Sequence, residues 1–230
     1  MNRQIFNIGT LNIFTDASVK QLGNGKYVSC AGCVCVTTKE NGSTEVIDER
    51  YFVLNDSTNN RGELYGICQA VMIALEYRQY FNTINILSDS QFSIFGLREW
   101  IFKWKSNMVN ERYVNASGKD VANQDLFKLI INTIVSNNLY INFYHQKGHV
   151  NNNKGFQKAK RVFYQSNKID LDIQEVNGIC YYNDLVDINT GYKLDEIARD
   201  IEMPLIYSGN FDVKKYRKLI KRWLYESRKR

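Results

Sequence analysis

Four acidic residues could do chemistry together because each lies at an end of a predicted element: Asp16, Glu63, Asp89 and Asp187. Asp16 and Asp89 each close an apolar, β-prone run, Glu63 lies in the first turn of a predicted helix, and Asp187 ends the segment YYNDLVD. Carboxylates that converge raise one another's pKa unless a cation neutralises them. Such hard oxygen ligands suit Mg²⁺ or Mn²⁺, and two ions about 3.5–4 Å apart can support phosphodiester hydrolysis.

The elements that must position these acids follow from the apolar pattern. Three consecutive antiparallel strands are predicted at 11–16, 27–37 and 44–54, with Asn41-Gly42 as a hairpin turn. Apolar residues at steps of three and four predict helices at 61–80, 91–105 and 123–137, and short apolar runs predict strands at 83–88 and 139–146. This order predicts an α/β (α+β layered) fold, in which a five-stranded mixed sheet is flanked by helices.

The bulk composition limits the class of protein. A chain of 230 residues with 44% hydrophobic content can bury a real core. We expect a catalytic domain at 1–190 with an insertion at about 151–180, and a C-terminal extension at 191–230. Five cysteines without an even framework, no membrane-spanning run and no signal peptide predict a soluble, cytoplasmic protein. We also expect a monomer, in a bacterial cell or a virus-infected host.

The net charge of +6 is placed unevenly along the chain. Residues 211–230 hold nine Lys and Arg against two acidic residues, which leaves residues 1–210 with 21 basic and 22 acidic residues. A basic amphipathic helix is predicted at 212–228, with an apolar stripe that includes Tyr216, Ile220 and Trp223. Two partners fit this helix: a nucleic acid bound through charge, or a protein surface (the catalytic body included) bound through the stripe.

The chain resembles type 1 ribonuclease H proteins. The segments FTDAS, STNNRGELYG, SDSQFSIFGLREW, NQDLF, QKGHV and NDLVD occur in the order typical of that family. The resemblance covers residues 10–150 and the 183–187 block. It implies the ribonuclease H fold and metal-dependent endonucleolytic cleavage of the RNA strand of RNA–DNA hybrids, with two Mg²⁺ ions or Mn²⁺ in their place.

The resemblance also implies roles for individual residues. Asp16, Glu63, Asp89 and Asp187 match the four metal-binding acids, and His149 matches a histidine that assists proton transfer or product release. The positions expected to contact the hybrid are Thr58, Asn59, Asn60, Gln91, Trp100, Trp104 and Lys147. For Thr58 and Asn59 the alternative is helix capping, and for both tryptophans it is plain core packing.

The spacing before the last acid departs from the family. His149 and Asp187 are 38 positions apart, far more than the family needs, so Asp170, Asp172 and Asp184 compete with Asp187 as the fourth acid. We favour Asp187 because 183–187 keeps the family's N-x-x-x-D spacing. The segment 106–122 takes the place of the family's basic protrusion but has two basic and two acidic residues, so its hold on DNA should be weaker.

Other signals are discounted, and two rival functions stay open. Cys33 and Cys35 share a strand face while Cys30 points oppositely, so a metal site there is not expected. His145 is interpreted as an ordinary strand residue. The rivals are a nuclease of the same fold that acts on DNA, and a hybrid-binding module without catalysis.

Overall fold

The computed structural model describes residues 4–55, 57–150 and 153–207. The basic helix predicted at 212–228 lies outside these residues. Within them no helix is both long enough and apolar enough to cross a membrane.

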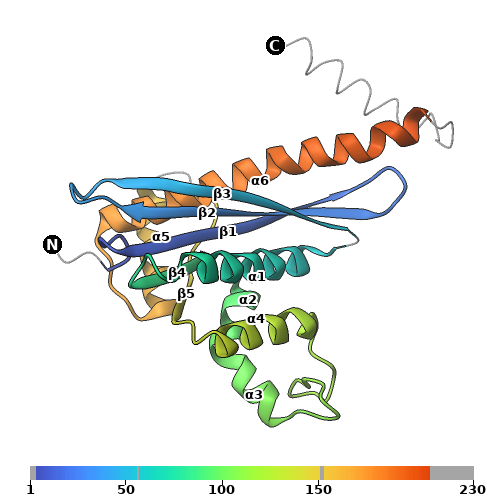
Figure 1. The fold of residues 1–230 in the computed structure, drawn as a ribbon, viewed down its shortest axis with the longest axis horizontal. Helices are drawn as coiled ribbons and strands as arrows, with labels where there is room; N and C mark the ends of the chain where they lie inside the picture. The colour runs from blue at the N-terminus through green and yellow to red at the C-terminus, as the bar shows by residue number, and fades with distance from the viewer. Residues whose placement is uncertain (1–3, 56, 151–152, 208–230) are drawn as a thin grey trace.

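A five-stranded mixed sheet forms the centre of the molecule (Figure 1). Its strands are β1 (Thr10–Gln21), β2 (Tyr27–Thr38), β3 (Thr44–Asn55), β4 (Thr83–Ser88) and β5 (Ile141–His145), in the spatial order β3-β2-β1-β4-β5. The β1–β2 and β2–β3 pairs are antiparallel, whereas β4 is parallel to β1 and β5 is parallel to β4. The predicted sheet, with three antiparallel strands first, is therefore confirmed.

Helices cover both faces of the sheet, as Figure 1 shows for α1 and α6. One face carries α1 (Asn59–Tyr77) and α4 (Gln124–Ser136). The predicted helix at 91–105 is present as three joined segments, α2 (Gln91–Phe95), the π-helical η1 (Gly96–Trp100) and α3 (Ile101–Ser106). The other face carries α5 (Asn153–Asn167) and α6 (Ile173–Tyr207).

The sheet separates two apolar cores. Leu11, Ile13 and Ile86 pack on the α1 side with α1 and α4, while Phe14 and Leu87 pack on the α6 side. This division follows from the alternation of side chains along a strand. All five cysteines are free and buried. Those at 33 and 35 join the α1-side core and the one at 30 joins the α6 side, as predicted.

Three predictions about element ends are wrong or need refinement. The first strand does not end at Asp16 but continues to Gln21, because β2 pairs with β1 through Gln21 and Tyr27. The first helix begins at Asn59, which moves Glu63 out of its first turn. The boundary predicted at residue 190 falls inside α6, a single helix that starts within the predicted insertion and runs on to Tyr207.

Candidate active site

Asp16 lies where the parallel part of the sheet ends. The β1–β4 pairing stops at Phe14 and Leu87, two residues before Asp16, while β1 continues alone with β2. The Asp16 side chain is therefore at the β4 end although the residue is in mid-strand, and it is only 8% exposed. Burial and, after it, the charges of Asp89, Asp187 and Glu63 together raise the pKa of Asp16 from 3.8 to about 8, against a hydrogen bond from the Ala17 N–H that lowers it.

Asp89 follows directly after β4, next to Asp16 across the parallel pair. Its side chain is half-buried, and burial raises its pKa, as does the charge of Asp187. The nearby His149 and Lys147 act in the opposite direction. The charges of Asp16, Asp89 and Asp187, which come from β1, the residue after β4 and α6, therefore act on one another.

Glu63 joins the cluster from the second turn of α1. Thr58 caps this helix, because its side chain accepts a hydrogen bond from the Arg61 N–H. The Glu63 carboxylate accepts hydrogen bonds from Ser90 Oγ at 2.5 Å and from Asn59 Nδ2 at 2.8 Å. Burial raises its pKa, the Ser90 bond lowers it, and Asp89 raises it. Ser90 follows Asp89 directly and is the N-cap of α2, so this hydrogen bond connects Glu63 to the segment that carries Asp89. No sequence pattern indicated this link.

Asp187 projects from α6 toward the same place. Its Oδ2 lies 3.4 Å from His149 Nδ1, and the histidine side chain is 74% exposed. Gly32 makes this approach of α6 possible: it pairs with Asp16 across β1 and β2, and a Cβ on it would lie 2.1 Å from Thr190 Oγ1, one turn beyond Asp187. Any larger residue at position 32 would push α6 away from the acids.

The competing acids have other partners. Asp170 forms an ion pair with Lys160 at 3.0 Å, and Asp172 accepts a hydrogen bond from the Glu175 N–H at 2.8 Å at the start of α6. Only Asp184 lies close to the cluster: burial raises its pKa, and so does the charge of Asp187. Of the four candidates, Asp187 is the one whose charge acts on both Asp16 and Asp89.

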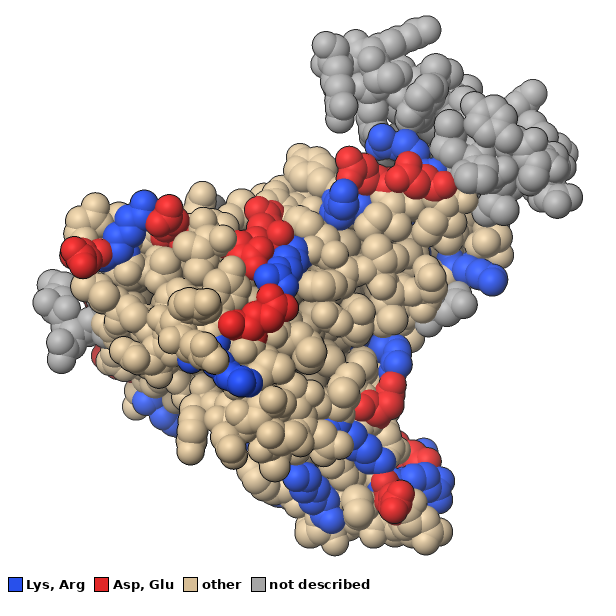
Figure 2. All heavy atoms as spheres, in the orientation of Figure 1, with Lys and Arg blue, Asp and Glu red and all other residues tan. Residues whose placement is uncertain are grey.

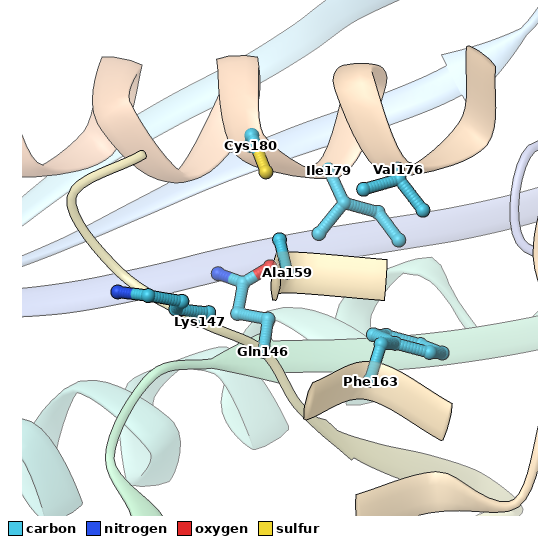
Figure 3. A pocket seen from close by; sticks show the side chains of 7 residues that line it. All are labelled: Gln146, Lys147, Ala159, Phe163, Val176, Ile179 and Cys180. Carbon is cyan, nitrogen blue, oxygen red and sulfur yellow. The ribbon is translucent and has the colours of Figure 1, made fainter. Parts of the chain in front are cut away.

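The loop after β5 is held on both sides. A Cβ on Gly148 would lie 2.0 Å from Asp89 Oδ2, so only glycine leaves the aspartate its place. Gln146 is buried and donates a hydrogen bond through Nε2 to the buried Asn183, one turn before Asp187 on α6. Figure 3 shows the Gln146 side chain directed toward α5 and α6 in a small pocket lined by Ala159 and Cys180 among others. The sequence motif contained both polar residues, but nothing in it showed that they pair.

The predicted substrate-binding residues fall into two groups. Thr58, Asn59, Asn60 and Gln91 are exposed at the starts of α1 and α2, beside Glu63 and Asp89, and Lys147 is half-buried in the loop after β5. The tryptophans are different. Trp104 is 8% exposed and packs edge-on against Phe127, and the half-buried Trp100 packs against Trp104. The alternative of core packing therefore accounts for Trp104, and the predicted contact of Trp104 with substrate is not supported.

The acidic cluster fits a divalent cation by its chemistry and its charge. Among the residues that the structure describes, no three His, Cys, Asp or Glu side chains are gathered closely enough to hold an ion as they stand. Glu63 is engaged by Ser90 and Asn59, and Asp187 by His149. Among the described residues the buried Asp16 carboxyl has no cationic partner, and burial first and the charges of the neighbouring acids second raise its pKa. A hard cation bound there would offset both effects.

Comparisons with known proteins show the family and the fold of the chain. The family described as RNase H matches residues 9–165. A ribonuclease HI of Haemophilus ducreyi is 34% identical over 61% of this chain and 79% of its own length, and a ribonuclease HI of Haemophilus influenzae is 34% identical over 60% and 78%. The solution structure of the PFV RNase H domain is 21% identical with a TM-score of 0.52, covering 67% of this chain and 92% of that domain, which shows a shared fold.

Proposed function

The chain belongs to the ribonuclease H family, and we propose that it hydrolyses the RNA strand of RNA–DNA hybrids at the cluster of Asp16, Glu63, Asp89 and Asp187. One observation carries the assignment of the site: the charges of Glu63, Asp89 and Asp187, which come from α1, the residue after β4 and α6, all act on the buried Asp16 of β1. Since all four belong to one chain, the site needs no second copy, and we propose that the protein acts as a monomer.

The family generally depends on divalent metal ions. We propose that the four acids hold two Mg²⁺ ions, or Mn²⁺ in their place. Such ions, when bound, lower the pKa of a water molecule and stabilise charge on the leaving oxygen. The residues contribute the negative charge that attracts the ions, and the bonds from Ser90 and Asn59 hold Glu63 in the cluster.

His149 is the residue proposed to move a proton. Its imidazole is exposed to solvent and touches Asp187, so one ring nitrogen can face the carboxylate while the other remains open to solvent. An imidazole ring can both accept and donate a proton, which is what proton transfer during turnover requires.

The starts of α1 and α2 are proposed to recognise the hybrid. Asn59, Asn60 and Gln91 are exposed amides beside the acids. Short amides can reach 2′-hydroxyls and base edges in the shallow minor groove, and the 2′-hydroxyl distinguishes RNA from DNA. Selectivity for the RNA strand would therefore come from these elements.

A cleavage assay with three substrates tests this function. Labelled RNA–DNA hybrid, duplex RNA and duplex DNA are each incubated with the full chain in Mg²⁺ or in EDTA, beside Asp89→Asn. The matched control is Asp195→Asn, which removes an exposed carboxylate paired with Lys20. We expect Mg²⁺-dependent cleavage of the hybrid alone, lost in Asp89→Asn and kept in the control. Equal cleavage of duplex DNA would favour the DNA nuclease, and binding without cleavage would favour the non-catalytic module.

The basic segment 211–230 is proposed to add affinity for the hybrid that does not depend on base sequence. Deleting it should then raise KM for the hybrid and flatten the dependence of KM on salt, because fewer counterions are released on binding. A loss of folding or binding that does not change with salt would instead indicate that its apolar stripe docks on protein.

A further inference from the structure

The positive charge of the described chain is concentrated next to the site rather than in the expected protrusion. Residues 146–169 contain six basic residues and no acidic residue, which leaves 15 basic and 22 acidic residues in the rest of 1–210. In the protrusion at 106–122, Arg112 is paired with Asp120 at 3.0 Å. On the face drawn in Figure 2, Lys and Arg are interspersed with Asp and Glu, without a large patch of one sign.

Most of this basic stretch lies on α5, which has two distinct faces. Ala159 and Phe163 are buried in the core between the sheet and α6. Lys158 and Arg161 are on the exposed side of the helix, and Tyr164 is 52% exposed beside them. Lys160 is already paired with Asp170, whereas Lys158 and Arg161 form no ion pair with any residue that the structure describes. The exposed side therefore presents uncompensated positive charge.

The end of α5 is fastened to the corner of the sheet that carries Asp89. Asn167 accepts a hydrogen bond from the His145 N–H at 3.1 Å and donates one to the His145 carbonyl at 2.8 Å. Ser166 Oγ lies 2.9 Å from His145 Nδ1. His145 in turn pairs with Ser88, the residue before Asp89. These bonds connect the helix to the strand ends that support the acidic cluster.

From this placement we propose that the exposed face of α5, formed by Lys158, Arg161 and the adjoining Lys168 with Tyr164, binds the sugar–phosphate backbone of the nucleic acid beside the cleavage site. The inference rests on the proposed function, and it assigns to an inserted helix the charge that the protrusion lacks. Lysine and arginine that neutralise phosphates release counterions, which gives affinity without sequence preference. A partially exposed tyrosine next to them can pack on a sugar or an unpaired base.

The test is the salt dependence of hybrid binding by the full chain. Lys158→Gln/Arg161→Gln is compared with Lys39→Gln/Arg78→Gln, which removes the same charge at the β2–β3 turn and at the end of α1 away from Glu63. Binding of a fluorescent RNA–DNA hybrid is measured by anisotropy between 50 and 200 mM salt, with all proteins in the Asp89→Asn background. We expect the α5 pair to lower the slope of log Kd against log salt by about 2 and to weaken binding on the order of tenfold at 0.1 M salt.

The control pair should leave the slope as it is in the parent. An unchanged slope for the α5 pair, or an equal change in both pairs, would overturn the inference and would point to a different partner, such as an acidic protein surface. Lys158 and Arg161 are exposed, so their substitution should leave the fold intact. Equal melting temperatures of the variant and the parent would verify this. If the unmodified chain cleaves hybrid while the α5 pair binds normally, only this inference fails. If the unmodified chain cleaves no hybrid, the proposed function fails first.

Discussion

Replacing Asp16 by asparagine should stabilise the metal-free protein while abolishing its activity. The Asp16 carboxyl is buried in mid-strand, is acted on by the charges of three other acids and has no cationic partner within 4–55, 57–150 and 153–207, so its charge is costly to the native state. Asparagine has nearly the same shape and keeps an oxygen that can accept the hydrogen bond from the Ala17 N–H, which is 2.7 Å long. The substitution therefore removes the charge with little change in packing.

The magnitude follows from the pKa of Asp16. Its value rises from 3.8 to about 8 on folding, so the native state binds this proton more tightly than the unfolded chain does. The contribution of Asp16 to stability is therefore complete below about pH 4 and is lost as the pH rises to about 8. At 1.36 kcal/mol per pH unit, the loss by pH 7 is on the order of 4 kcal/mol. This is an upper limit, because the neighbouring acids share protons with Asp16.

Urea unfolding in EDTA at pH 5.5, 7 and 8.5 measures this effect. The free energy of unfolding of the parent should fall across this range, whereas that of Asp16→Asn should fall less and should exceed the parent's at pH 8.5. Adding Mg²⁺ should stabilise the parent more than the variant, since the ion binds the charged cluster. Asp195→Asn serves as the control and should follow the parent. An Asp16→Asn protein that is less stable than the parent at pH 8.5 in EDTA would refute the reasoning.

Three further predictions concern the same site and its support. Asp187→Asn should lower kcat at least 100-fold, while Asp172→Asn should keep both activity and stability, because the asparagine oxygen still accepts the hydrogen bond from the Glu175 N–H; hybrid cleavage and urea unfolding check both, and the reverse pattern of activity would identify Asp172 as the fourth acid. Gly148→Ala should displace the carboxylate of Asp89 and weaken activation by Mg²⁺ at least tenfold in a metal titration; an unaltered titration would contradict this. Trp104→Ala should cost about 3–5 kcal/mol of stability in urea unfolding, because it empties a core position, whereas a raised KM at full stability would restore its role in substrate contact.

Sequence reasoning was reliable where a local pattern reports burial. Four of the five strands and the helices at 91–105 and 123–137 were predicted to within a few residues, because alternation and three- to four-residue steps record which side of an element is buried. The first strand was predicted five residues too short at its end. Asp89 was placed correctly because the short apolar run before it ends where β4 ends.

Residues that act through distant packing could not be found in this way. The capping link from Ser90 to Glu63 and the pair formed by Gln146 and Asn183 each join elements that are separate in the sequence. Both residues of each pair were visible as polar residues, but a polar residue has many available partners. Only the packing of α6 and α2 against the sheet selects one of them.

The sequence by itself determined that the chain builds a mixed sheet whose acids Asp16, Glu63 and Asp89 could converge, since the order of strands and the apolar faces leave few ways to form one core. Only the tertiary structure showed that Asp16 lies in mid-strand, because β1 extends beyond the end of its parallel partner β4. It also placed Asp187, rather than Asp170 or Asp172, where its charge acts on both Asp16 and Asp89. His149 and Asp187 are 38 positions apart, and nothing in the sequence between them shows how close the two residues lie in space. Asp187 reaches the site because α6 crosses the sheet in close contact with Gly32.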